Sequence, residues 1–470
     1  MTAEALIGLI MLVVLLGAIF IGVPISFTLL FLAFVFGYFG MGGDTVFDLA
    51  YFQIIGLMKE ELLAAVPLFV LMGYITEQAG LMERLFTAFR LLLAPVRGAL
   101  YLVVILTSTV FAMATGIVGA AVTVLGIMAA PIMTKAGYDG RLSAGTITAG
   151  GTLGILIPPS VMLVVMGPVL GISVADLYAA AFGPGFLLAA FYITYLMVRS
   201  FINPKLGPPV PLDERVHSLG YMLREVAIGT VPLIGLITAT LGSILFGLAT
   251  PTEAAGVGAA GSLLLMLAYG RFTWAGFQRA LHATMATSSM VLLLAVTSNI
   301  FGAVFARLGT ANWITNSLLS FDLPPLMMLV LVLVLIFLLG WPFEWPAIVL
   351  VFLPIFYPVV AALKIDLVWF GALVAVTLQT AFLSPPVAMS AYYLKQVVKD
   401  WSLKTIYAGM FQFMVLQCIC IALLIAFPPI ATWFPNKLQE VARAQKIPEA
   451  HQKILDRQRQ APSLEESDLK

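Results

Sequence analysis

The sequence predicts an all-α protein that crosses a membrane many times, and composition is the first reason. Of its 470 residues, 61% are hydrophobic and only 10% are charged, whereas a soluble domain carries about 25% charged residues. Apolar runs recur from one end of the chain to the other, and a bilayer core requires about 20 apolar residues per helix. A third observation is that these runs fall into two groups around one polar segment. Water is therefore not the main solvent of this chain.

The polar segment divides the chain into two membrane halves. Residues 201–225 are rich in proline and charge, which indicates an extramembrane linker between a first half, 1–200, and a second half, 226–431. The start of the chain lacks the basic residues of a signal peptide and stays apolar too long for one, so it predicts the first membrane helix. Residues 432–470 form a charged tail. The apolar runs expected to be membrane helices are 5–40, 63–79, 98–114, 117–134, 142–170 and 174–199, then 226–250, 252–270, 285–306, 323–341, 345–363, 367–395 and 406–431.

Charge and a scarcity of reactive residues exclude several function classes. The formal net charge is +1, from 24 Lys and Arg against 23 Asp and Glu, so no strong field favours nucleic acid. Cys418 and Cys420 lie in one apolar run and define neither a disulfide framework nor a metal site. The histidines, His217, His282 and His451, lie outside the deep apolar runs, and no nucleophile with a base is evident. We expect no enzyme activity and no bound cofactor.

An internal repeat relates the two halves without a gap. A shift of 227 residues, the distance from Pro24 to Pro251, superimposes further prolines and aspartates. The other matched pairs are Pro131 with Pro358, Asp139 with Asp366, Pro158-Pro159 with Pro385-Pro386, and Met162 with Met389. A double proline inside a membrane segment is costly, so its recurrence in register argues against chance. Matched, interrupted segments of this kind are typical of transporters built from structural repeats.

Each half contains a helix that the double proline should break. The two stretches are TAGGTLGILIPPS at 148–160 and TLQTAFLSPP at 377–386. Proline lacks the amide hydrogen and disfavours helical geometry in the preceding residue, so Ile157 and Ser384 should leave the helix. The freed carbonyls, with hydroxyl oxygens such as that of Thr152, can bind Na⁺, while half-helix amino termini favour an anion. The alternative is a pair of purely structural kinks.

A second interruption precedes each broken helix. FAMATGIVGAAV at 111–122 and LLGWPFEWPAIV at 338–349 carry small residues or prolines within apolar sequence. They predict the tips of re-entrant hairpins, which are tolerated only where they are buried in protein. Glu344 stands at the second tip and is the strongest ionisable candidate, because a charge within a membrane segment is costly. A cap or an interfacial salt bridge is the alternative role for Glu344. Glu253, after Pro251, is expected to cap a helix start, and a role in the site is its alternative.

These motifs resemble those of one transporter family. TLGILIPPS at 152–160, TPTEAAG at 250–256 and the second double-proline motif are similar to segments of the large membrane subunit of tripartite ATP-independent periplasmic (TRAP) transporters. The variant LQTAFLSPP at 378–386 looks most like the branch associated with 2-oxo acids and related carboxylates. The resemblance covers nearly all of residues 1–430. It implies two inverted repeats and an elevator fold, in which a transport domain of hairpins and broken helices slides within a scaffold domain.

The same resemblance implies an activity, partners and a site. The chain would import small organic anions, such as 2-oxo acids or dicarboxylates, across the bacterial inner membrane with Na⁺ as the coupling ion. It would work with a small four-helix membrane subunit and receive substrate from a periplasmic binding protein. The implied substrate-binding residues are Thr115, Thr152, Ser160, Glu344 and Thr380. The implied Na⁺ ligands, largely backbone carbonyls, are Gly116, Gly119, Gly151, Gly154, Ile155, Trp341, Glu344, Gln379, Leu383 and Ser384.

Two alternatives compete with this interpretation. A divalent-anion/Na⁺ symporter-like carrier would share the architecture and would work without a binding protein. A membrane-embedded enzyme is the alternative of another class, but the sequence has no HExxH or GxSxG motif in a suitable setting. A neighbouring gene for a secreted binding protein would favour the TRAP interpretation over the symporter.

Overall fold

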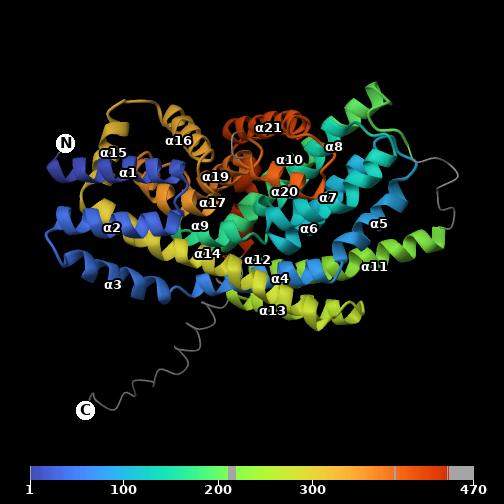
Figure 1. Ribbon diagram of the computed structural model, residues 1–470, viewed down its shortest axis with the longest axis horizontal. Coiled ribbons are helices and arrows are strands. Elements are labelled where there is room, and N and C mark those ends of the chain that lie inside the picture. Colours follow the sequence, from blue (N-terminus) through green and yellow to red (C-terminus); the bar gives the residue numbers. More distant parts are fainter. Residues whose placement is uncertain (1, 210–218, 386–387, 442, 444–470) are drawn as a thin grey trace, which may run out of the picture.

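Helices form every regular element in the part of the chain that the computed structural model describes, residues 2–209, 219–385, 388–441 and 443. Within that part, nine helices are long and apolar enough to cross a membrane, and a tenth is added if one bent pair counts as a single span. The all-α, multi-pass architecture expected from the sequence is therefore confirmed (Figure 1). Pro386, His217, His451 and most of the predicted tail lie outside the described residues, as do the side chains of Thr115 and Leu219.

The first half of the chain runs from α1 to α10. Its elements are α1 (Ala3–Ile21), α2 (Ile25–Met41), α3 (Thr45–Met58), the 3-10 helix η1 (Glu61–Ala64), α4 (Ala65–Gln78), α5 (Leu81–Leu93), α6 (Ala99–Thr115), α7 (Val118–Lys135), α8 (Gly140–Leu156), α9 (Val161–Leu170) and α10 (Val174–Ile202).

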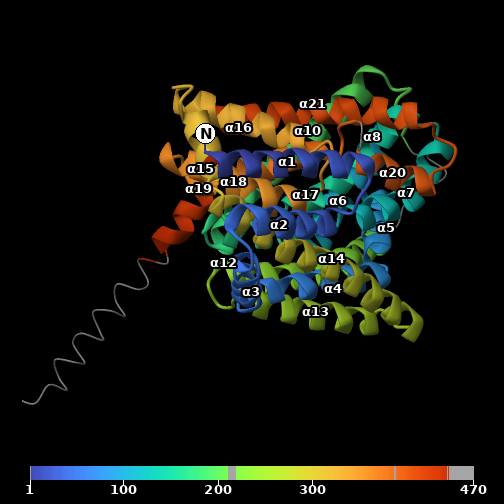
Figure 2. The ribbon, with the colours of Figure 1, turned by 60° about the vertical axis from the view of Figure 1, so that its left-hand side comes forward.

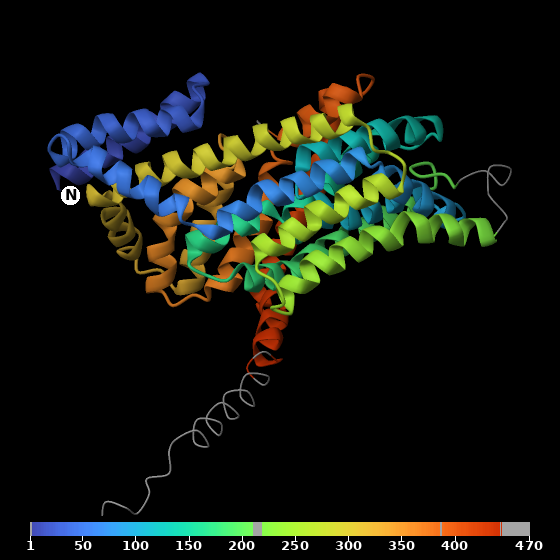
Figure 3. The same ribbon diagram turned by 90° about the horizontal axis from the view of Figure 1, so that it is seen from below.

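The second half runs from α11 to α21. Its elements are α11 (Leu219–Ile237), the π-helix η3 (Thr238–Gly242), α12 (Ser243–Leu245), α13 (Pro251–Ala268), α14 (Trp274–Arg307), α15 (Thr310–Leu319), α16 (Pro325–Leu339), α17 (Trp345–Ala347), the π-helix η4 (Ile348–Phe352), α18 (Leu353–Ala362), α19 (Leu367–Ala381), α20 (Met389–Val397) and α21 (Leu403–Ala426). Residues 429–441 form a further helical segment that leaves the bundle (Figure 3).

The helix bounds recur at the shift seen in the sequence. Moving α7 along the chain by 227 residues, the separation of Thr152 and Gln379, carries it onto residues 345–362. That range begins at the first residue of α17 and ends at the last residue of α18. The last residue of α2 falls on the last residue of α13, and the first residue of α8 falls on the first residue of α19. The two halves thus place their helices in the same order and with closely similar lengths.

Matching caps explain why the helices begin at matching positions. The carboxylate of Asp139 accepts a hydrogen bond from the Leu142 amide at 2.8 Å, and that of Asp366 accepts one from the Trp369 amide at 2.8 Å. Such caps satisfy an amide that has no partner inside its own helix. Glu253 forms a capping box with Thr250 at the start of α13, so the expected capping role of Glu253 is confirmed.

One pair of segments differs between the halves. Residues 45–78 form α3, η1 and α4, whereas the segment that follows Thr273 forms a single helix, α14, of 34 residues. Pro67 lies in the first turn of α4, where proline is tolerated because the amide there has no partner within the helix. No proline occurs in α14.

Two groups of helices surround the candidate site. We call α2, α3, α4, α13 and α14 the outer layer, in which α4 packs on α13 and α14, and α14 packs on α2 and α3. We call α6 to α10 and α16 to α21 the core bundle, in which α8 packs against α6, α7 and α21. Figures 1 and 2 place the outer layer on one side of the molecule and α21 on the other, and Figure 3 shows the outer layer face on.

Candidate functional site

The first double proline breaks a helix, as expected. The axes of α8 and α9 are bent by 44° across residues 157–160, and Ile157 has extended geometry with φ −79° and ψ 122°. Because Pro158 and Pro159 cannot donate amide hydrogens, nearby carbonyls lose their usual partners. The hydroxyl of Ser160 donates to one of them, the carbonyl of Ile155, at 2.5 Å. The break is therefore buried, and one of its freed carbonyls is paired with a hydroxyl of the same segment.

The second break is organised differently. Helix α19 ends at Ala381, and α20 begins only at Met389 after Ala388, whose φ is +36°. Ser384 lies in the non-helical segment, and its buried hydroxyl has no hydrogen-bond partner among the described residues. The departure of Ser384 from helical geometry is thus confirmed.

The two broken helices meet inside the core bundle. The side-chain Nε2 of Gln379 donates a hydrogen bond of 2.7 Å to the backbone carbonyl of Thr152, and these residues are 227 positions apart. Residues at equivalent positions of two repeats contact each other only near the axis that relates the repeats. The Oε1 atom of Gln379 is buried and has no partner among the described residues. This centre of the bundle therefore offers unsatisfied oxygen atoms of the kind that hard cations bind.

The first hairpin tip packs directly on the first broken helix. Gly116 has φ +61°, and a Cβ atom there would lie 3.4 Å from the carbonyl oxygen of Pro159 and 3.5 Å from the amide nitrogen of Val161. Gly151 lies still closer to the hairpin, since its Cβ would fall 2.3 Å from a side-chain carbon of Val122. Glycine is thus favoured at position 116 by the positive φ and at position 151 by the close approach of Val122.

The second hairpin tip packs on α19. Residues 340–344 connect α16 to α17, and a Cβ atom on Gly340 would lie 2.5 Å from the Cβ of Ala381. Glu344 immediately precedes α17 at the N-cap position and makes no capping hydrogen bond. The repeat shift places Glu344 on Ile117, which holds the N-cap position of α7 and also makes no side-chain cap.

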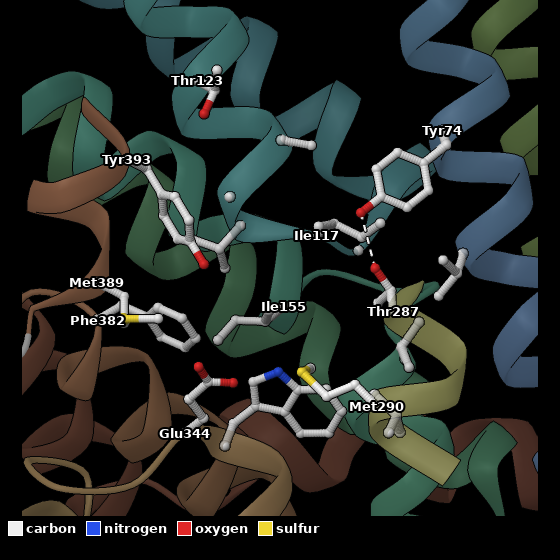
Figure 4. Close-up of a pocket in the computed structure, with 18 of the residues that line it drawn as sticks. Tyr74, Ile117, Thr123, Ile155, Thr287, Met290, Glu344, Phe382, Met389 and Tyr393 are labelled. Atoms are coloured by element: carbon white, nitrogen blue, oxygen red, sulfur yellow. Dashed lines mark hydrogen bonds between the residues drawn. The ribbon is translucent and has the colours of Figure 1, made fainter. Parts of the chain in front are cut away.

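Both tips open into one cavity of about 570 Å³ between the core bundle and the outer layer. The core bundle contributes Gly116, Gly119, Ile155, Glu344 and Tyr393 among others. The outer layer contributes Tyr74 and Glu77 from α4 and Thr287 and Met290 from α14. Figure 4 shows the Glu344 carboxylate and the Tyr393 hydroxyl pointing into the cavity, opposite Tyr74 and Thr287, whose hydroxyl oxygens lie 3.0 Å apart. We call this space the tip cavity.

A second cavity, of about 400 Å³, occupies a related position. Several of its lining residues are equivalent, by the repeat shift, to residues that line the tip cavity. The pairs are Glu60 with Thr287, Leu63 with Met290, Leu350 with Thr123, and Val169 with Gln396. We call this space the counter cavity, because residues of one half line it at positions equivalent to those at which the other half lines the tip cavity.

The structure brings most of the predicted site residues together, in two shells. Gly116, Gly119, Ile155 and Glu344 line the tip cavity. A buried second group lies behind that surface: Gly151, Thr152, Gly154, Ser160, Gln379, Thr380, Leu383 and Ser384. Trp341 is 38% exposed, stacks edge-on with Phe337 and is not among the lining residues. The side chain of Thr115 lies outside the described part.

The outer-layer half of the tip cavity was not predicted from the sequence. Tyr74, Thr287 and Met290 had no distinguishing pattern, because the packing of distant helices decides which face of α4 or α14 meets the cavity. Glu77 did have a distinguishing pattern, since it is an acidic residue within the apolar run at 63–79. An ionisable residue in such a run is a candidate functional residue, because placing a charge within a membrane segment costs free energy.

Comparison with known proteins gives consistent matches over most of the chain. Residues 10–430 match the family described as tripartite ATP-independent periplasmic transporter, DctM component. The sialic acid TRAP transporter large permease protein SiaM of Vibrio cholerae is 31% identical over 426 residues, which cover 90% of this chain and 96% of that protein. The C4-dicarboxylate TRAP transporter large permease protein DctM of Rhodobacter capsulatus is 29% identical over 440 residues, with 89% and 96% coverage.

A solved structure has a similar fold. The YdaH transporter of Alcanivorax borkumensis superimposes with a TM-score of 0.57 over 83% of this chain and 89% of that one, at 17% sequence identity.

Proposed function

Because the chain belongs to the DctM component family of the tripartite ATP-independent periplasmic transporters, we propose that it imports small organic anions by Na⁺-coupled elevator transport. As a large permease subunit it is a multi-pass protein of the bacterial inner membrane, not an enzyme. Its proposed partners are a small four-helix membrane subunit and a periplasmic binding protein. The family match disfavours the membrane-embedded enzyme and leaves the symporter-like carrier without a binding protein as the weaker alternative.

The observation that carries the elevator mechanism is the pair of repeat-related cavities. If the halves are inverted repeats, an axis in the membrane plane relates the tip cavity to the counter cavity and puts them on opposite sides of the membrane. A core bundle that slides along the outer layer would then enlarge one cavity while it reduces the other. The first tip and the first broken helix would move together, because Gly151 packs tightly against Val122 of α7 and Gly116 is in van der Waals contact with Pro159.

The electrostatics of the tip cavity support cation coupling. Glu77 and Glu344 line it, and no Lys, Arg or His occurs among its described lining residues. Two unit charges about 8 Å apart interact with about 2 kcal/mol at an effective dielectric constant of 20. An anion entering alone would therefore be repelled, whereas one that enters with Na⁺ would not. Gln379 Oε1, Ser384 Oγ and freed carbonyls are the oxygen atoms proposed to hold that Na⁺.

The proposed substrates are carboxylates, such as 2-oxo acids or dicarboxylates. The names of two relatives specify sialic acid and C4-dicarboxylates, and both substrates carry a carboxylate group. The open amino-terminal turn of α7 at the first tip offers backbone amides to such a group, since the N-cap residue Ile117 provides no side-chain acceptor.

The test is uptake by vesicles that contain this chain with its membrane and periplasmic partners. An inward Na⁺ gradient should drive accumulation of a carboxylate pool, and replacing Na⁺ by choline should abolish accumulation. Equal uptake in choline would contradict Na⁺ coupling. Equal uptake without any binding protein would instead favour the symporter-like carrier.

A further inference from the structure

The two hairpin tips differ in charge at equivalent positions. Ile117 and Glu344 hold the N-cap positions of α7 and α17, and both line the tip cavity. The amino-terminal turn of α7 therefore has amides without a negative partner. The amino-terminal turn of α17 already has a carboxylate of the protein beside it. Of the two places where this cavity could receive a substrate carboxylate, only the first is free of an acidic side chain.

A second carboxylate faces the same space from the outer layer. Glu77 lies on α4 and lines the tip cavity. Within the described residues it makes no salt bridge shorter than 4.0 Å. Because α4 belongs to the outer layer, the charge of Glu77 stays fixed while the core bundle moves in the proposed mechanism. A substrate with two negative charges would meet both Glu77 and Glu344, with no basic side chain among the described lining residues.

The remaining wall of the tip cavity is mostly apolar. Phe382 and Met389 line it beside Glu344, and Met290 lines it from the outer layer (Figure 4). Such surfaces are favourable for an alkyl or aryl body and offer no partners to a row of hydroxyl groups. The neutral side chains of the lining that can form hydrogen bonds are Tyr74, Thr123, Thr287, Trp345, Tyr393 and Gln396.

We propose that the tip cavity accepts carboxylates with a single negative charge and an apolar body, and that Glu77 and Glu344 exclude dianions. This inference rests on the proposed function and narrows it to one class of substrate. The single carboxylate lies at the start of α7, and the apolar body lies against Phe382, Met389 and Met290. A keto or hydroxyl group next to the carboxylate can reach a neutral hydroxyl of the wall.

The experiment compares two acids of one chain length that differ by a terminal carboxylate. The purified full chain in lipid nanodiscs, in saturating Na⁺, is titrated calorimetrically with 2-oxopentanoate and with 2-oxopentanedioate. We expect the monoacid to bind with a dissociation constant at least tenfold lower, which is about 1.4 kcal/mol. Equal affinities, or tighter binding of the diacid, would overturn the inference while leaving an anion carrier intact. Binding of neither acid would overturn the proposed function as well.

Variants of one residue separate charge from shape. Glu77→Gln removes the outer-layer charge and should reduce the preference for the monoacid at least threefold, whereas Glu77→Asp keeps the charge and should retain the preference. Glu83→Gln is the matched control, because Glu83 is an exposed residue of α5 that does not line the cavity. An unchanged preference in Glu77→Gln would show that Glu77 does not select against dianions. Sialic acid, a monoanion with a polyhydroxylated body, should bind more weakly than 2-oxopentanoate.

Discussion

Replacing Gly151 by alanine tests the contact between the first tip and the first broken helix. Gly151 lies in α8, where an added Cβ atom would fall 2.3 Å from a side-chain carbon of Val122 and 3.1 Å from its backbone nitrogen. Real Cβ atoms do not approach so closely, and a backbone nitrogen cannot move aside as a flexible side chain does. The hairpin and the broken helix must therefore separate.

The expected cost follows from two opposing effects. Overpacking a well-packed core costs about 1–3 kcal/mol, and replacing a helical glycine by alanine returns about 0.4–1 kcal/mol through the unfolded state. The net loss of stability is therefore about 1–2 kcal/mol. If the tip must close on the break during transport, the same penalty lowers the population of the closed state by a factor of roughly 5–30.

The assay is thermal unfolding in detergent together with Na⁺-driven uptake in vesicles. Gly256→Ala is the control, because Gly256 lies in α13 with no heavy atom within 4 Å of its added Cβ. We expect Gly151→Ala to lower the unfolding temperature and uptake, and Gly256→Ala to raise the unfolding temperature slightly with uptake unchanged. A Gly151→Ala variant with full stability and uptake would refute the close contact on which the site is built.

Three further predictions concern single side chains. Glu344→Ala should abolish Na⁺-driven uptake while the unfolding temperature stays near that of the wild type, and a fully active variant would remove Glu344 from the site. Gln379→Leu deletes the hydrogen bond to the Thr152 carbonyl and should cost about 0.5–1.5 kcal/mol of stability; the Na⁺ concentration for half-maximal uptake should rise, and an unchanged value would argue against Gln379 as a cation ligand. Asp139→Ala and Asp366→Ala each remove one helix cap, and thermal unfolding should show that each costs about 1 kcal/mol of stability. A double variant that loses much less stability than the sum of the two single losses would show that the two caps are coupled.

The sequence was sufficient to predict the features that depend on local chemistry. Two adjacent prolines remove two successive amide donors, so the break at Pro158-Pro159 followed from the chain alone, as did the departure of Ser384 from the helix. Asp139 and Asp366 are caps for an equally local reason. The shift between the halves needed only the spacing of these residues.

Features that depend on packing between distant helices could not be predicted in the same way. Whether Tyr74 and Thr287 face the site depends on the rotation of α4 and α14 about their axes, which the apolar sequence does not specify. The indole of Trp341 stacks on Phe337 and does not line the tip cavity, an orientation that the sequence did not indicate, and the role of Trp341 as a Na⁺ ligand stays a prediction.

Sided labelling of the two cavities is the most direct test of the elevator mechanism. Met290 lines the tip cavity and Leu63, its repeat equivalent, lines the counter cavity. With Cys418 and Cys420 replaced by serine, Met290→Cys and Leu63→Cys are each labelled in oriented vesicles by a membrane-impermeant maleimide applied from one side. The account predicts labelling from opposite sides, with Na⁺ and substrate changing the two rates in opposite directions. Labelling of both cysteines from the same side would contradict it.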